Sequence, residues 1–230
     1  EILSGLVGSE MCIRDRQVLD EKWITGFAEE ICAKREQHIR WSCSVEKEEQ
    51  GYLVYITGEW EEMKVPLVIR ISPLVYHAAK PEKQKLQSVF FEKKCAVYQH
   101  FPVETYLAEQ LFSILKFLEL IPSMEVYDTA FRLLEQETVD GRHIYETLSF
   151  LCGNEEVIPQ EKRIEMLESY DTYTYMKKRW EKYVRKQGIE NVSWETVLRR
   201  IVLFLRPIWN AMCRDEVFFG DWMPDLERYL

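Results

Sequence analysis

The sequence predicts an α+β protein with two parts: a small α+β part over residues 17–99 and a helical part over residues 100–230. Between residues 39 and 45, apolar residues alternate with polar ones, which is typical of a half-buried strand, and residues 52–57 are apolar on both faces of a second strand. From residue 101 onward they recur every three or four residues, as on amphipathic helices. Hydrophobic residues make up 47% of the chain and charged residues 30%, which favours a folded chain over a disordered one.

Residues 1–16 are expected to lie outside this fold. They show neither helical nor strand periodicity, and no positive charge precedes the apolar stretch Ile2–Val7, so they do not form a signal peptide. The run resembles the translation of a sequencing adapter, as found at the ends of genes from metagenomic assemblies. We therefore expect an artefactual or disordered leader, with the natural sequence beginning near Gln17 and its N-terminal part missing.

The α+β part begins with a helix that Asp20 can cap, and its predicted inward residues are Trp23, Ile24, Phe27 and Ile31. Three strands of an antiparallel meander follow. The first is predicted over residues 39–45, the second over residues 52–57, and the third over residues 65–71, with turns at residues 46–51 and 58–64. Val65, Leu67, Ile69 and Ile71 are expected to share one face of the third strand. Residues 73–99 read as a lysine-rich connector.

The helical part is predicted to contain five helices. The first carries an apolar stripe from Val103 to Leu118 and is stopped by Pro122, and the third is ended by Gly153. Ser193 can cap the fifth helix, which Pro207 should kink. The predicted inward residues of the second to fifth helices are Tyr127, Ala130, Phe131, Leu134, Ile144, Leu148, Leu151, Tyr173, Met176, Trp180, Tyr183, Val184, Trp194, Val197, Ile201, Leu205, Ile208 and Met212.

Charge and composition exclude several classes of function. The formal net charge is −9, so the chain as a whole is not a broad polyanion binder, and any nucleic-acid contact must come from a local basic patch. The six cysteines are scattered without a Cys-x-x-Cys pair, which favours reduced thiols in a cytoplasmic protein. The most apolar stretch, Tyr106–Ile121, is interrupted by three charged residues, so no membrane partner is expected.

Motifs for metal, nucleophilic and phosphate-loop chemistry are missing from the sequence. The four histidines lie far apart from one another, and the sequence contains no zinc signature, so no metal site is predicted. The sequence contains neither a Gly-x-Ser-x-Gly elbow nor a glycine-rich phosphate loop.

One predicted helix carries a concentrated set of cations around Trp180 and Tyr183. Lys178, Lys182 and Arg185 fall on one face of this helix, and the aromatic residues fall on another. Such a stripe can bind a nucleic-acid backbone, which makes these three residues candidates for RNA binding. The alternative is a solvated face that covers a core-facing aromatic stripe.

Glu109 and Asp128 are the two candidate catalytic residues, on adjacent predicted helices. Glu109 interrupts an apolar segment, and burying an unpaired carboxylate is costly, so an inward position would require a partner. Periodicity alone favours a structural ion pair or cap over catalysis at these positions.

Residues 101–111 read Phe-Pro-Val-Glu-Thr-Tyr-Leu-Ala-Glu-Gln-Leu and resemble the segment "YP-x-ET-x-x-AEK-L" of the AbiEii/AbiGii nucleotidyltransferase toxin family. Several later features are also similar to that family. They are the pair Tyr127-Asp128, the Trp180 helix, residues 202–207, residues 222–224 and the strand at residues 68–72.

The resemblance implies a partial minimal-nucleotidyltransferase sheet, antiparallel or mixed, followed by a C-terminal helical bundle. It implies a cytoplasmic toxin of a bacterial toxin–antitoxin (abortive infection) system, with Glu109 and Asp128 as matched site residues. The complete family member is implied to use Mg²⁺ and an NTP to transfer a nucleotide to an acceptor, often tRNA. Carboxylates would hold the metal, which polarises the α-phosphate. An antitoxin protein and tRNA are the implied partners.

The sequence departs from this family where the chemistry is expected. Arg70 stands at the position of the third acid, Gln110 replaces a lysine, and the Gly-Ser loop with paired acids would precede residue 17. A guanidinium repels a divalent cation, so we expect no Mg²⁺ or NTP site and no activity in the chain as given. The alternative is a non-catalytic module of the same fold that binds antitoxin or RNA. A third hypothesis is a helical interaction protein with an accidental likeness.

Overall fold

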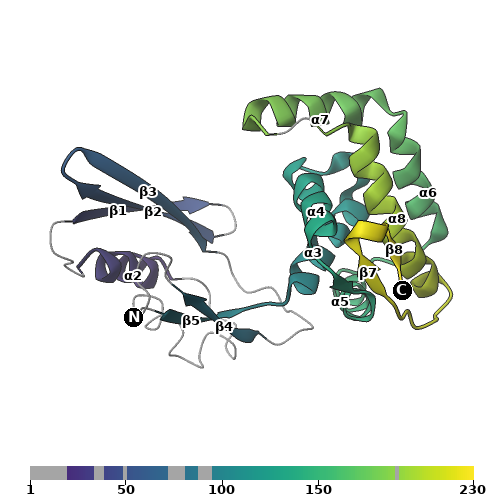
Figure 1. Cartoon of the computed structure of the whole chain (residues 1–230), viewed down its shortest axis with the longest axis horizontal. Helices are drawn as coiled ribbons and strands as arrows, with labels where there is room; N and C mark the ends of the chain where they lie inside the picture. The colour runs from purple at the N-terminus through teal and green to yellow at the C-terminus, as the bar shows by residue number, and fades with distance from the viewer. Residues whose placement is uncertain (1–19, 34–38, 49–50, 72–80, 88–94, 190–191) are drawn as a thin grey trace. The chain divides into compact units, whose positions relative to one another are not determined.

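The computed structural model describes residues 20–33, 39–48, 51–71, 81–87, 95–189 and 192–230 (Figure 1). The chain divides into two compact units. A sheet unit comprises residues up to Tyr76 together with Lys83–Gln99, and a helical unit comprises His77–Glu82 together with His100–Leu230. The α+β class is confirmed. Residues 1–16 lie outside the described residues. None of the described helices is both long and apolar enough to cross a membrane.

The sheet unit contains the predicted antiparallel meander. Strands β1 (Arg40–Glu48), β2 (Gly51–Trp60) and β3 (Met63–Ile71) pair in that order. Helix α2 (Glu21–Ala33) packs on β1 and β2. The Lys22 backbone N–H donates to Asp20 Oδ1 at 3.0 Å, so the predicted cap is present.

The core of this unit forms between α2 and the central strand. Its fully buried residues are Ile24, Ala28, Tyr52, Val54 and Ile56. The inward prediction for Trp23 is wrong, because its side chain is 53% exposed. Ile24 and Ala28 lie one above the other at a spacing of four, whereas position 23 is rotated by about 100° from that line. Trp23 instead stacks on Phe27, with ring centroids 5.9 Å apart.

The hairpin between β2 and β3 is tighter than predicted. The turn consists of Glu61 and Glu62 alone, with a positive φ of 53° at Glu61, so the strands extend through residues assigned to the 58–64 turn. Val65 and Leu67 are exposed, since α2 packs on β1 and β2 and leaves this end of β3 uncovered. The register puts them on the same side of the sheet as the α2-packed residues, as predicted.

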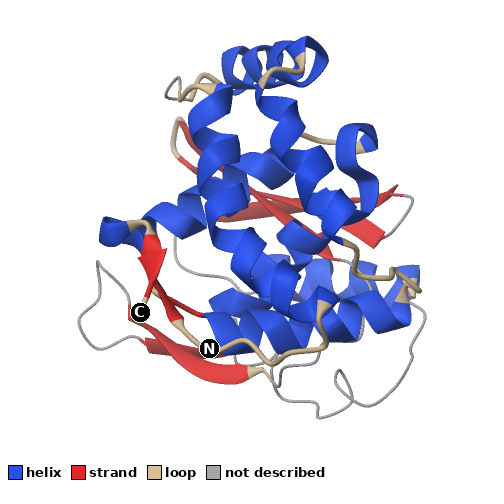
Figure 2. Cartoon of the chain, turned by 90° about the vertical axis from the view of Figure 1, so that its right-hand side faces the viewer, coloured by secondary structure: helices blue, strands red, loops and turns tan. Residues whose placement is uncertain are grey.

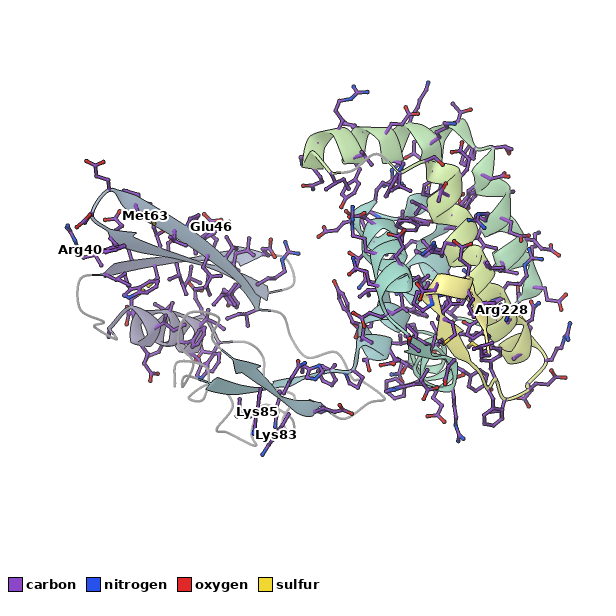
Figure 3. All side chains as sticks on the ribbon, in the orientation of Figure 1. Arg40, Glu46, Met63, Lys83, Lys85 and Arg228 are labelled. Carbon is purple, nitrogen blue, oxygen red and sulfur yellow. The ribbon has the colours of Figure 1, made fainter. Side chains whose placement is uncertain are left out.

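The prediction that residues 73–99 form a connector is partly wrong. It contains two strands, β4 (Glu82–Gln87) and β5 (Cys95–His100), which form a two-stranded sheet. The rest of the connector, at residues 73–80 and 88–94, lies outside the described residues. Lys83 and Lys85, two positions apart on β4, project on the same side of that strand (Figure 3).

The helical unit has more elements than the five predicted helices, and Figure 2 shows its helices in blue. The short helix α6 was not predicted, α5 continues through Gly153, and α3 ends at Phe117 with a 3₁₀ turn (η1) before Pro122. The helix that holds Pro207 is a single element. The elements are α3 (Val103–Phe117), η1 (Leu118–Leu120), α4 (Glu125–Gln136), β6 (Val139–Asp140), α5 (Gly141–Asn154), α6 (Glu161–Glu168), η2 (Ser169–Asp171), α7 (Thr174–Gln187), α8 (Trp194–Cys213), β7 (Asp221–Met223), η3 (Pro224–Leu226) and β8 (Arg228–Tyr229).

Four buried tryptophans connect the helices of this unit. Each side chain is at most 2% exposed, and each indole N–H donates to a main-chain carbonyl oxygen. Burying this polar group therefore leaves no unpaired donor. The four bonds are Trp180 to Val192 at 2.8 Å, Trp194 to Tyr170 at 2.8 Å, Trp209 to Gln160 at 2.8 Å and Trp222 to Leu134 at 3.1 Å.

The C-terminal residues pack back onto the bundle through the small sheet β6-β7-β8. Glu227, next to β8, accepts hydrogen bonds from Arg199 at 3.0 Å and from Arg200 at 2.6 Å, both on α8. The Tyr229 hydroxyl donates to the Phe204 carbonyl oxygen at 2.8 Å. These contacts fix the chain end against the longest helix of the unit.

Candidate nucleic-acid interface

Helix α7 is held firmly in the helical unit, which gives its outer face a defined position. Met176, Trp180 and Val184 are buried at spacings of four, as the helical period predicted. At its C-terminus Gly188 takes a left-handed conformation (φ 63°), and its N–H donates to the Val184 carbonyl oxygen at 3.0 Å. Tyr173, predicted to face inward, lies just before the helix and is exposed, so that prediction is wrong.

The three predicted RNA-binding residues are all exposed on the outer side of α7. Lys178, Lys182 and Arg185 are spaced by four and three residues, which puts them on one face over about 10 Å of helix axis. Within the described part of the chain, none of them forms an ion pair or a hydrogen bond. Their charges face solvent, and Glu181, three positions after Lys178 and four before Arg185, is the acidic residue of the same helix.

Two neighbouring cations of α7 have structural partners instead, whereas Lys186, like the three stripe residues, is exposed. Lys177 Nζ lies 2.5 Å from Glu195 Oε1 on α8. This hydrogen bond raises the pKa of Lys177 and lowers the pKa of Glu195. Arg179 points to the end of η1, where its guanidinium donates to the carbonyl oxygens of Glu119 at 3.0 Å and Ile121 at 2.5 Å. Helical spacing separated the three stripe residues from these two cations, but it did not indicate the partners of Lys177 and Arg179.

Arg185 also borders a hollow between α7 and the start of α8. The hollow has a volume of about 610 Å³. Its lining includes Lys177 and Arg185, with Glu181 and Glu195 as opposing charges. The balance of two cations and two carboxylates gives the hollow no preference for an anion, unlike the outer face of the helix.

Asp128 has a structural environment on α4. Its Oδ1 accepts a hydrogen bond from Arg132 Nε at 2.9 Å, and its Oδ2 accepts one from the Tyr183 hydroxyl of α7 at 3.2 Å. Burial and the adjacent carboxylate raise the pKa of Tyr183 to about 12, so the phenol keeps its proton and remains a donor. Asp128 therefore contributes to joining α4 and α7, with both oxygens already hydrogen-bonded.

Glu109 lies partly buried in the middle of α3, and this burial raises the pKa of its carboxyl group. Arg70 is in the other unit, on β3, where its Nε lies 3.4 Å from Glu48 Oε2 in an exposed ion pair. The described residues contain no group of three or more His, Cys, Asp or Glu side chains placed to hold a metal ion.

An exposed aromatic residue on the same face of α7 was not identified from the sequence. Tyr175 precedes Lys178 by three positions and Lys182 by seven, so it shares their stripe. That spacing is the sequence signal that could have identified Tyr175.

Comparisons with family models, curated proteins and solved structures find no match for this chain.

Proposed function

We propose that this chain binds RNA through the outer face of α7. The observation that carries the proposal is the set of three exposed cations, Lys178, Lys182 and Arg185, on one face of α7. The segment Thr174–Gln187 holds six basic residues and one acidic residue, although the chain as a whole is acidic. A local patch of this kind attracts a phosphate backbone and releases its counterions, while the acidic remainder opposes binding elsewhere.

The geometry favours this binding role over nucleotide transfer. Asp128, one of the two candidate catalytic residues, is hydrogen-bonded to Arg132 and Tyr183. Arg70, at the position where the resemblance implies an acid, pairs with Glu48. The chain thus fits the hypothesis of a non-catalytic module of the nucleotidyltransferase-like fold, with tRNA as the first RNA to test.

Binding is tested by fluorescence anisotropy with labelled tRNA over a range of salt concentrations. The test variant carries Lys178→Glu, Lys182→Glu and Arg185→Glu. The control carries Lys162→Glu, Arg214→Glu and Arg228→Glu, which reverse three exposed cations elsewhere in the helical unit and change the net charge equally. Arg228 lies on β8, away from α7 (Figure 3).

For the unmodified chain, three phosphate contacts predict a log–log salt slope of about −2 to −3. The α7 variant should lose at least about tenfold in affinity, and its slope should approach zero. The control should stay close to the unmodified chain. Equal loss in both variants would show that only net charge matters and would refute an α7 site.

A second candidate function is nucleotide transfer by a toxin of the AbiEii/AbiGii type, with Mg²⁺ and an NTP as cofactors and an antitoxin as partner. Glu109 favours it, because a carboxyl group with a raised pKa in a partly buried position is typical of functional sites. The test is incubation of the chain with labelled NTPs, Mg²⁺ and tRNA. We expect no transfer of label by this chain, and labelled tRNA that depends on Glu109 would establish the enzymatic function instead.

A further inference from the structure

The Tyr175 side chain is exposed to solvent, and its ring also contacts Arg179 of the same helix. Its side chain is 51% exposed in the first turn of α7. The Arg179 guanidinium lies 5.6 Å from the centre of the Tyr175 ring, in the range of a cation–π contact. The Tyr173 ring lies nearby, with its centroid 5.8 Å away.

Arg179, which contacts this ring, is itself held in place by hydrogen bonds. Arg179 donates hydrogen bonds to carbonyl oxygens of Glu119 and Ile121. Lys178 and Lys182 follow Tyr175 by three and seven positions along the helix. The Tyr175 ring therefore lies against a guanidinium that is held by its own hydrogen bonds. Its exposed surface lies beside the cations that would contact phosphates. An exposed, supported aromatic ring next to a basic stripe is the arrangement with which proteins stack unpaired bases.

We propose that Tyr175 stacks an unpaired base of an RNA whose backbone follows Lys178, Lys182 and Arg185. The ligand class is then single-stranded RNA, or an unpaired loop or end, rather than a duplex. In a duplex the bases are already stacked on one another, so a flat side chain beside the backbone gains little. This inference rests on the RNA-binding function proposed above and specifies the ligand of that same surface.

The test compares a labelled oligouridylate with an RNA duplex of equal length, using Tyr175→Ala, Tyr175→Phe and the control Tyr106→Ala. Tyr106 is exposed to a similar extent, 49%, on α3. Tyr175→Ala should weaken binding of the single strand about 5- to 150-fold. Its salt slope should stay unchanged, because no phosphate contact is lost. Tyr175→Phe should retain most of the affinity, and Tyr106→Ala should bind like the unmodified chain.

A second readout follows the stacked base directly. A 2-aminopurine placed in the single strand should lose fluorescence on binding to the unmodified chain and to Tyr175→Phe, but not to Tyr175→Ala. If the α7 charge reversal abolishes binding while Tyr175→Ala leaves affinity and fluorescence unchanged, stacking is refuted and the RNA site stands. If the charge reversal has no effect either, both proposals fail. Equal affinity for the duplex and the single strand would also refute the stacking proposal.

Discussion

The close approach of two backbone segments at Gly141 predicts a large effect on stability from adding one methyl group there. Gly141 begins α5, and its N–H donates to the Gly220 carbonyl oxygen at 3.0 Å. A Cβ at position 141 would clash with that same oxygen and would lie 2.7 Å from the Phe218 ring. The obstacle at Gly220 is backbone, so it cannot rotate away as a flexible side chain could.

The expected cost follows from three contributions. Overpacking typically costs about 1–3 kcal/mol, and weakening the Gly141–Gly220 hydrogen bond about 0.5–1.5 kcal/mol. The better helix propensity of alanine returns at most about 1 kcal/mol. We therefore expect Gly141→Ala to lower the free energy of unfolding of the helical unit by about 2 kcal/mol.

Gly153, near the end of the same helix, supplies the matched control. A Cβ there would meet nothing within 4 Å, so Gly153→Ala should leave the free energy of unfolding unchanged or raise it by up to about 1 kcal/mol. Urea unfolding followed by far-ultraviolet circular dichroism measures both variants. Equal stability of the two variants would refute the packing of the C-terminal segment against α5 described above.

Two further predictions concern acid stability and oxidation. Burial opposes ionisation of Glu227, but hydrogen bonds from two arginines of α8 outweigh it and lower its pKa. A carboxyl with a lowered folded-state pKa stabilises the protein above the ordinary glutamate pKa, and this contribution is lost as pH falls through the lowered value. Acid titration of unfolding should therefore show a steeper loss of stability in the unmodified chain than in Glu227→Gln, and parallel curves would contradict this. In the sheet unit, burial and then the neighbouring Cys43 thiol of β1 raise the pKa of the Cys32 thiol of α2 to about 11. Oxidised glutathione at alkaline pH should oxidise the pair to a disulfide, with mass spectrometry detecting a linked peptide that is absent in Cys43→Ser; two unlinked, glutathionylated cysteines would be the opposing result.

Local signals explain why much of the fold was predictable. Asp20 and Ser193 could be predicted as helix caps because a side-chain oxygen just before a helix can accept a hydrogen bond from a free backbone N–H of the first turn. Both bonds are present: Asp20 Oδ1 accepts from the Lys22 N–H, and Ser193 Oγ accepts from the Thr196 N–H at 3.1 Å. The alternation in β1 was equally direct, since every second residue from Trp41 is partly buried up to Val45. Both features depend only on neighbours in the sequence.

The sequence predictions were wrong or incomplete where local sequence patterns do not determine the structure. Helix α6 has only Ile164 and Leu167 buried, too few for a clear helical period. Gly153 did not end α5, since a glycine in open space costs a helix only about 1 kcal/mol. Within the candidate site, the three exposed cations followed from helical spacing, but the role of Arg179 depends on carbonyl groups 57 to 60 residues away, which spacing cannot indicate.

The central claim, that RNA binds on the outer face of α7, is tested most directly by ultraviolet cross-linking of the full chain to RNA, with mass spectrometry of the linked peptides. We predict that the peptide containing Tyr175 and Lys178 carries most of the cross-linked nucleotide. Cross-links concentrated instead on the exposed lysines Lys83 and Lys85 of β4, with none on α7, would contradict the account.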